Sequence, residues 1–152
     1  VLEFLIKNKE LKLYICSASN EKKFLKFYNL EMYENIFFKG NIKEDSNEAR
    51  KIFNKCGYII SMNCSGGGSA ALAVGRRYGL IPLVWKNEDC NPKACFFINK
   101  ESYNGIKETI IKISKLKKLK YLSLSKKNQI ISKENTSVYY NKRLFRIFKN
   151  IE

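Results

Sequence analysis

Short apolar runs alternate along the chain with segments in which apolar residues recur every three or four positions. The apolar runs predict strands at residues 11–16, 35–39, 58–61, 81–85 and 94–98. The periodic segments predict helices at residues 2–6, 21–29, 47–55, 69–78, 104–116, 119–133 and 136–151, with Asp45 or Ser46 as a cap for the third of them. Strands that are apolar throughout and alternate with helices are typical of a parallel sheet covered on both faces. We therefore expect one doubly wound, Rossmann-like α/β domain with a helical C-terminal tail.

The net charge of +15 raises the question of an anionic partner, such as a membrane surface or a nucleic acid. Of the 29 basic residues, 24 are lysines, and several of them, such as Lys118 and Lys126, are spread through one predicted helical region. This spread is typical of a solvated helix face, and the alternatives are attraction to an anionic membrane and binding of nucleic acid. No apolar run approaches the roughly 20 residues that cross a bilayer. We expect a cytoplasmic protein, in peripheral contact at most with the inner membrane face, and no nucleic-acid partner.

The chain contains no histidine and has five cysteines. The absence of histidine excludes Ser-His-Asp and Cys-His catalytic arrangements within this chain, and it removes the commonest catalytic zinc ligand. The cysteines form no Cys-x-x-Cys pair and are expected to be reduced and mostly buried, as in a cytosolic protein: Cys16, Cys56, Cys64, Cys90 and Cys95.

A glycine-rich turn separates the predicted strand at 58–61 from the helix that follows it. From Ser61 to Ser69 its sequence is Ser-Met-Asn-Cys-Ser-Gly-Gly-Gly-Ser. Glycines let the backbone approach a ligand closely, and the free N–H groups at the start of the next helix form an anion site. Open α/β sheets bind ligands at the carboxyl ends of their strands, where this turn lies. We therefore expect the turn to bind a phosphate or diphosphate. A turn that binds no ligand is the alternative.

Known phosphate-binding patterns give a further alternative for the same turn. The P-loop pattern Gly-x-x-x-x-Gly-Lys-Ser/Thr is absent. Gly66-x-Gly68-x-x-Ala71 matches the dinucleotide fingerprint, and an NAD(P)-binding oxidoreductase is therefore an alternative. Glu88 and Asp89 lie at a suitable distance downstream to bind a ribose in that case, and contact with a metal or a plain polar loop are the alternatives for them. However, the fingerprint usually lies in the first strand-helix unit of a domain, whereas three predicted strands precede it here.

The stretch from Tyr58 to Trp85, YIISMNCSGGGSAALAVGRRYGLIPLVW, resembles the donor-site signature of family-4-like GT-B glycosyltransferases. In such proteins an apolar strand is followed by Ser-Glu-Gly-x-Gly, a helix of small residues, a Gly-Leu-Pro turn and another strand. The segment from Gly79 to Val84 is similar to the Gly-Leu-Ile-Pro-Ile-Val form of that ending. The runs at 11–16 and 35–40 resemble the strands that precede the signature, so the resemblance covers nearly the whole chain.

The resemblance implies the C-terminal, donor-binding half of a hexosyl-type glycosyltransferase. Such an enzyme transfers a sugar from a nucleotide diphosphate to a hydroxyl acceptor, with retention of anomeric configuration and without an obligatory metal or other cofactor. The acceptor, a glycan or a lipid-linked glycan, would be held by an N-terminal domain upstream of Val1. The family's first strand and basic phosphate clamp would also lie upstream, so residues 1–152 are expected to be a fragment, inactive and of low stability by itself.

The resemblance also assigns donor-site residues position by position. The diphosphate would be bound by the glycine-rich turn and the first helical residue, through the backbone of Gly66, Gly67, Gly68, Ser69 and Ala70. The base and ribose of the nucleotide would lie near Gly40, Asn41 and Val74.

The chain departs from the family at both donor-site glutamates. Counted from Gly79, those positions are Gly66 and Val74, so the carboxylates expected to contact the donor sugar and the ribose are missing. A catalytically degenerate glycosyltransferase-like domain is therefore an alternative, and no catalytic residue is assigned. Arg76 and Arg77 lie at the far end of the helix from the phosphate, and we expect a solvated last turn in which cations complement the helix dipole.

Overall fold

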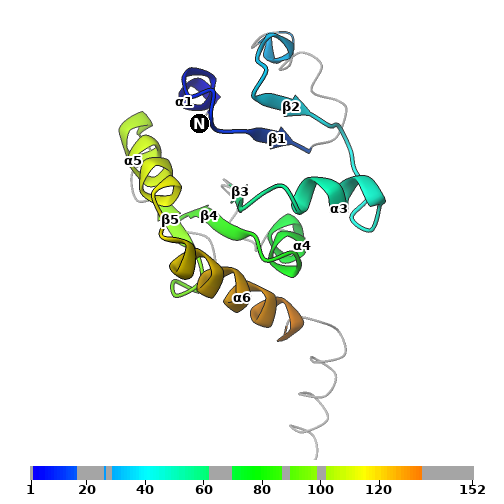
Figure 1. Ribbon diagram of the computed structural model, residues 1–152, viewed down its shortest axis with the longest axis vertical. Coiled ribbons are helices and arrows are strands. Elements are labelled where there is room, and N and C mark those ends of the chain that lie inside the picture. The colour runs from blue at the N-terminus through cyan, green and yellow to red at the C-terminus, as the bar shows by residue number, and fades with distance from the viewer. Residues whose placement is uncertain are drawn as a thin grey trace, which may run out of the picture. The chain divides into compact units, whose positions relative to one another are not determined.

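All five described strands run parallel to their neighbours, and they form two sheets in the computed structural model. The structure describes residues 2–16, 26, 29–61, 70–86, 90–98 and 102–134. The chain divides into two compact units, Val1–Lys55 and Cys56–Glu152, each with a sheet of its own. Parallel strands that alternate with helices (Figure 1) confirm the α/β class predicted from the sequence.

The first unit contains a two-stranded sheet and short helices. Its elements are α1 (Leu2–Lys7), β1 (Leu13–Ile15), the 3-10 helix η1 (Leu30–Met32), β2 (Ile36–Phe38) and α3 (Asn47–Phe53). β1 and β2 pair with Tyr14 opposite Phe37, and the two rings stack with their centroids 4.9 Å apart. Side-chain pairs across neighbouring strands stabilise a sheet, and a two-stranded sheet is marginally stable without such contacts.

Asn35 connects the end of α1 to the sheet of the first unit. Its side chain is buried, and Nδ2 donates to the carbonyl oxygens of Leu5 at 2.7 Å, Leu11 at 3.0 Å and Asn8 at 3.3 Å. The last carbonyl groups of a helix have no partner within the helix, and a buried carbonyl group without a hydrogen bond is unfavourable. The carbonyl groups of Leu5 and Asn8 also accept from the backbone N–H groups of Asn8 and Leu11, so the Asn35 amide adds to the turn that follows α1 and links it to the start of β2.

Two serines cap helices by accepting a backbone hydrogen bond. The Ser46 hydroxyl accepts from the N–H of Ala49 at 3.1 Å at the start of α3, which confirms one of the two caps predicted from the sequence. The Ser102 hydroxyl accepts from the N–H of Gly105 at 3.2 Å and caps α5 (Tyr103–Ser114) in the same way.

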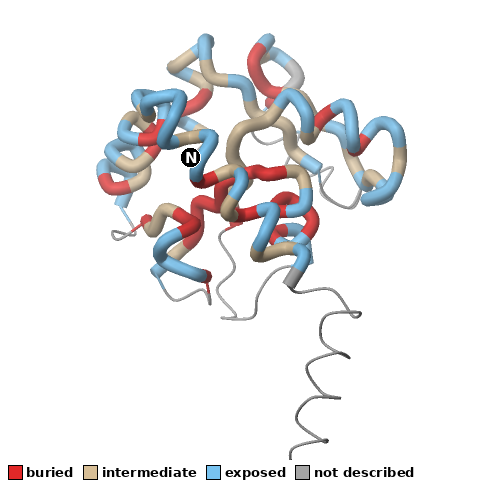
Figure 2. The backbone as a smooth tube through the Cα atoms, turned by 60° about the horizontal axis from the view of Figure 1, so that its bottom comes forward, coloured by how far each residue is buried: buried red, intermediate tan, exposed pale blue. Residues whose placement is uncertain are grey.

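The second unit contains a three-stranded sheet with β4 at its centre. Its elements are β3 (Tyr58–Ser61), α4 (Ala70–Arg77), β4 (Ile81–Trp85), β5 (Phe96–Ile98), α5, and α6 (Lys118–Glu134). The strand order is β3-β4-β5. The first four residues of β4 are buried, as expected for the central strand of a covered parallel sheet, and they belong to the backbone drawn red in Figure 2.

α4 packs against β3, β4 and α6 (Figure 1). Gly75 allows the close approach to β3, because a Cβ atom at this position would lie 2.8 Å from Cδ1 of Ile59. The helix ends in a Schellman motif: the N–H of Leu80 donates to the carbonyl of Gly75 at 3.0 Å, and the N–H of Gly79 donates to that of Arg76 at 2.9 Å. Packing along its length and a defined end fix the direction of α4, and hence the position of its N-terminus.

Some predicted boundaries differ from the structure. The last strand begins at Phe96 rather than at Ala94, because residues 91–94 form a turn in which the N–H of Ala94 donates to the carbonyl of Asn91 at 2.9 Å. The helix expected at 21–29 lies mostly outside the described residues, and the helix expected at 136–151 lies entirely outside them. The single doubly wound sheet and the single domain over residues 1–152 stay predictions, since the strands form two small sheets in two units.

Candidate functional site

β3, α4 and β4 form a parallel strand-helix-strand unit. The two strands pair in register from Tyr58 opposite Ile81 to Ser61 opposite Val84. Because both strands run in the same direction, their carboxyl ends meet at one edge of the sheet. From that edge the chain leaves Ser61 and continues to Ala70, the first residue of α4 (Figure 1). Ligands of open parallel sheets bind at this edge.

Most of the predicted diphosphate site lies outside the described residues. Gly66, Gly67, Gly68 and Ser69 belong to the segment 62–69, which the structure does not describe. Ala70 is exposed and is the first residue of α4, a helix of eight residues. The first N–H groups of a helix have no acceptor within it and carry a partial positive charge. The position of Ala70 therefore suits an anion site, and the assignment of all five residues stays a prediction.

Val74, one of the two positions at which the resemblance expects a glutamate, lies on the buried side of α4. Its side chain is 6% exposed, and Leu72, Gly75 and Arg76 are also buried on this helix. A valine at this position adds apolar contact to the core of the unit, whereas a carboxylate there would need a partner. The predicted proximity of Val74 to a ribose stays a prediction.

Arg76 is buried, so the solvated turn predicted for Arg76 and Arg77 is wrong for the first of them. The side chain of Arg76 is 8% exposed, and Nη2 donates to Sγ of Cys90 at 2.7 Å. Its Nε is buried and has no hydrogen-bond partner among the described groups. Arg77, in contrast, is exposed. Periodicity assigns charged residues to the solvent face of a helix. It cannot predict that a segment distant in sequence, here the chain after β4, covers one side of α4.

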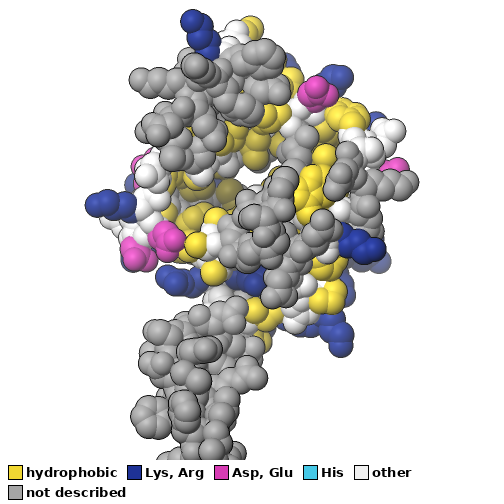
Figure 3. All heavy atoms as spheres, turned by 180° about the vertical axis from the view of Figure 1, so that it is seen from behind, with side chains coloured by type: hydrophobic (Ala, Val, Ile, Leu, Met, Phe, Trp, Pro, Cys, Tyr) yellow, Lys and Arg dark blue, Asp and Glu magenta, His cyan; other side chains and the backbone are white. Residues whose placement is uncertain are grey.

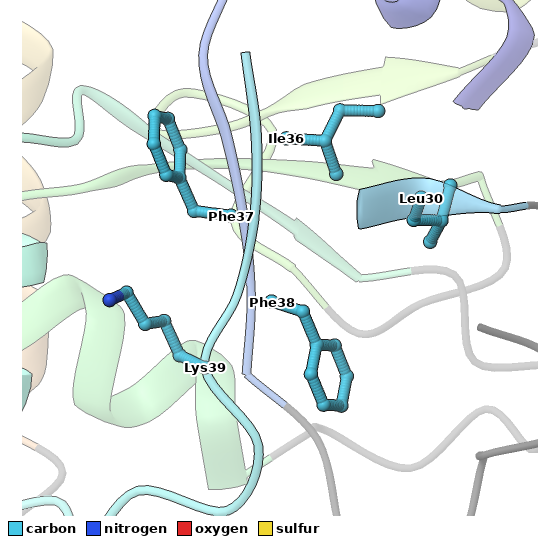
Figure 4. A pocket seen from close by; sticks show the side chains of 5 residues that line it. All are labelled: Leu30, Ile36, Phe37, Phe38 and Lys39. Carbon is cyan, nitrogen blue, oxygen red and sulfur yellow. The ribbon is translucent and has the colours of Figure 1, made fainter. Parts of the chain in front are cut away.

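A cavity of about 310 Å³ lies along β2 in the first unit (Figure 4). It is lined by Leu30, Ile36, Phe37, Phe38 and Lys39. Side chains alternate along a strand, and Ile36 and Phe38 point to one side of β2 while Phe37 and Lys39 point to the other (Figure 4). Phe37 stacks with Tyr14 on its side of the strand, so Phe38, on the other side, is the ring suited to stacking with a nucleobase.

Gly40 and Asn41, the residues predicted near the nucleotide base, follow this cavity directly along the chain. Gly40 has a φ of +64°, a left-handed conformation that favours glycine, and Asn41 is exposed. Their nearness to the aromatic lining is compatible with the prediction, which stays untested.

A tyrosine pair in the second unit has a structural role that the sequence analysis missed. The hydroxyl of Tyr58 donates to the carbonyl oxygen of Ile113 at 2.9 Å, and its ring meets that of Tyr121 edge to face with centroids 5.9 Å apart. Burial raises the pKa of both hydroxyls, with a smaller contribution from Tyr121 at Tyr58 and from Cys56 at Tyr121. Tyr58 therefore stays protonated near neutral pH and ties β3 to the end of α5 as a hydrogen-bond donor.

The raised pKa of Tyr58 predicts a loss of stability in alkali. A hydroxyl whose pKa is higher in the folded than in the unfolded state stabilises the fold as long as it is protonated in both states. This contribution is fully present below the unfolded pKa, about 10, and is lost as the pH rises through the folded pKa. The melting temperature of the wild-type chain should therefore exceed that of Tyr58→Phe most clearly below about pH 10, and the difference should narrow above it. The two proteins differ only in this hydroxyl, so a pH-independent difference would contradict this account.

Within the described residues, no three Cys, Asp or Glu side chains lie together in a group able to hold a metal ion. Desolvation of the sulfur and the Glu48 carboxylate raise the pKa of the Cys16 thiol, against the opposing effect of Lys39. Cys16 is therefore mainly a protonated thiol near neutral pH and not an activated nucleophile.

Comparison with known proteins does not assign the chain to a family. No family model matches it, and the search of curated proteins found no match.

Proposed function

We propose that the chain is the nucleotide-sugar-binding half of a hexosyl-type glycosyltransferase of the GT-B class. The observation that supports this most strongly is the β3–α4–β4 unit, in which a segment with three consecutive glycines connects the carboxyl end of a parallel strand to a helix N-terminus. In this proposal, backbone N–H groups of residues 66–70 bind the diphosphate of the donor.

The chemistry asked of these residues is electrostatic. When the glycosyl bond breaks, negative charge develops on the phosphate oxygen of the departing nucleoside diphosphate. N–H groups that are already oriented at the N-terminus of a helix stabilise that charge without having to reorganise, and the helix dipole adds to their effect. This role needs no side chain, which suits a segment made of glycine, serine and alanine.

The proposal includes a finer description of the fold and of the setting in which the protein works. The fold is the doubly wound, Rossmann-like sheet of a GT-B donor domain, and the glycan or lipid-linked acceptor is bound by a second domain. The protein acts in the cytoplasm, in glycan biosynthesis, where the thiols of Cys16, Cys56, Cys90 and Cys95 stay reduced.

A catalytically degenerate domain is the second candidate, and the burial of Val74 favours it. Residue 66 is a glycine and residue 74 is a valine within the core, so neither position supplies the carboxylate that the resemblance expects. A domain of this kind would keep the fold and lose affinity for the donor, catalytic function, or both.

Substitution of Ala70 by proline tests the anion site directly. Proline is tolerated at the first position of a helix but has no N–H, so Ala70→Pro removes one donor and leaves α4 intact. Since hydrogen bonds to charged groups contribute roughly 1.5–3 kcal/mol, affinity for UDP, GDP or ADP should fall about 10- to 100-fold. Isothermal titration calorimetry on the 152-residue chain measures this loss.

Asn47→Pro is the matched control, because Asn47 is the exposed first residue of another helix, α3. It should leave nucleotide affinity unchanged. If the wild-type chain binds none of the three nucleotides, the degenerate domain is the better description. If it binds NADH and no nucleoside diphosphate, the oxidoreductase alternative replaces the proposal.

A further inference from the structure

α6 carries apolar side chains on two opposite sides. On the inner side, where the helix packs against α4 and β4, Leu124 is buried. On the outer side Leu119 is 82% exposed, and Leu122 and Ile130 are each 49% exposed. The inner residues contribute to the core of the second unit, whereas the outer aliphatic side chains are in contact with water.

The exposed aliphatic residues form a single stripe together with two lysines. Residues three or four positions apart lie on the same face of a helix, and that spacing relates Leu119, Leu122, Lys126, Ile130 and Lys133, which we call the outer stripe of α6. Lys126 and Lys133 are exposed as well. One exposed helix face therefore carries three aliphatic and two cationic side chains.

The charge around the outer stripe has one sign over a long stretch of sequence. No acidic residue occurs between Glu108 and Glu134, and the same stretch contains eight lysines. Figure 3 shows Lys and Arg side chains in dark blue at several separate places on the surface of the chain. A partner of this surface must accept aliphatic side chains and supply negative charge.

We propose that the outer stripe of α6 docks on an anionic lipid surface. The aliphatic side chains enter the boundary between headgroups and acyl chains, while the long lysine side chains keep their ammonium groups at the level of the lipid phosphates. Electrostatic attraction of the basic stretch to anionic headgroups adds to this binding and is weakened by salt. Among the described helices none is long and apolar enough to cross a membrane, and the helix in this proposal lies along the surface.

The exposed aliphatic residues of the outer stripe favour a lipid surface over a nucleic acid. Phosphates of a nucleic acid would attract the lysines equally well, but they offer no place to bury Leu119, Leu122 and Ile130. The aliphatic residues therefore distinguish the two partners, and the inference is independent of nucleotide binding by the same chain.

Flotation of the 152-residue chain with lipid vesicles tests the proposal. The wild-type chain should float with vesicles of equal parts phosphatidylcholine and phosphatidylglycerol, and it should not float with phosphatidylcholine alone. The triple variant Leu119→Gln, Leu122→Gln, Ile130→Gln should bind at least about tenfold more weakly, since both apolar burial and close approach are lost. These side chains are exposed, so circular dichroism of the variant should match the wild type.

The double variant Met32→Gln, Tyr103→Gln, at exposed apolar positions on other elements, should bind like the wild type.

Two lysine variants with the same change in net charge separate a local site from general attraction. Lys118→Gln, Lys126→Gln, Lys133→Gln should weaken vesicle binding more than Lys7→Gln, Lys51→Gln, Lys55→Gln, which are exposed on α1, on α3 and just after α3. Equal losses would overturn the proposal, as would full binding by the leucine and isoleucine variant. Absence of vesicle binding together with duplex DNA binding that depends on the same lysines would also overturn it, as would a dimer in solution that the aliphatic variant converts to monomer.

Discussion

Replacement of Leu83 by alanine is expected to lower the free energy of unfolding of the second unit by about 2–5 kcal/mol. Leu83 is fully buried at the centre of β4, opposite Ile60 in β3 and Phe96 in β5. The substitution removes three carbon atoms from this core and leaves a cavity that a strand paired on both edges cannot close. Urea unfolding measured by fluorescence of Trp85 reports the loss, because Trp85 lies on the same strand and is the only tryptophan of the chain.

Leu119→Ala is the control for Leu83→Ala, because it makes the same chemical change on a residue that is 82% exposed. Its effect on the free energy of unfolding should stay within about 0.5 kcal/mol. Similar losses for the two variants would show that β4 is not the centre of the core.

Gly79→Ala should destabilise the second unit by about 2–4 kcal/mol, from two separate causes. The first is conformational: Gly79 ends α4 with a φ of +78°, a left-handed conformation that disfavours a side chain. The second is steric, since a Cβ atom at this position would lie 2.5 Å from Oγ of Ser125 and 3.2 Å from Nε2 of Gln129, both in α6. Urea unfolding with Trp85 fluorescence measures the sum of the two.

A double-mutant cycle separates these causes. In a Ser125→Ala background the nearest atom is removed, so Gly79→Ala should cost less than it does in the wild type. Gly40→Ala isolates the conformational cause, because Gly40 has a φ of +64° and its nearest neighbour would be Cε1 of Phe38 at 4.0 Å. Its expected cost is about 1–2 kcal/mol, measured by circular dichroism. If Gly79→Ala costs the same in both backgrounds, contact with Ser125 is not the reason for glycine at this position.

Much of the local structure was predictable because its signals are short-range. The apolar run at residues 81–85 predicts a strand, and β4 spans Ile81–Trp85. Ser46 was one of two predicted caps for the helix beginning at Asn47, since a cap depends on residues within one turn. Periodicity also predicted a helix at 119–133, within one residue of Lys118–Glu134 at each end.

The buried polar residues were not predictable in the same way. Asn128 lies within a lysine-rich helix, yet it is fully buried, and its Nδ2 donates to the carbonyl oxygens of Ala94 at 2.7 Å and Leu124 at 3.0 Å. Asn35 and Arg76 are comparable cases, since each has its hydrogen-bond partners on other segments of the chain. Composition assigns such residues to the surface, because polar side chains are mostly exposed unless a partner compensates for their burial.

The candidate site combines both kinds of information. The sequence alone determined that three glycines and small residues lie between an apolar strand and a helix, because strand and helix periods are local properties of the chain. Tertiary structure decided that β3 and β4 are parallel neighbours, that Val74 and Arg76 face the core, and that Leu119, Leu122 and Ile130 face water. Those outcomes depend on which distant segments cover each face of a helix or strand, and no local pattern of hydrophobic and polar residues specifies that.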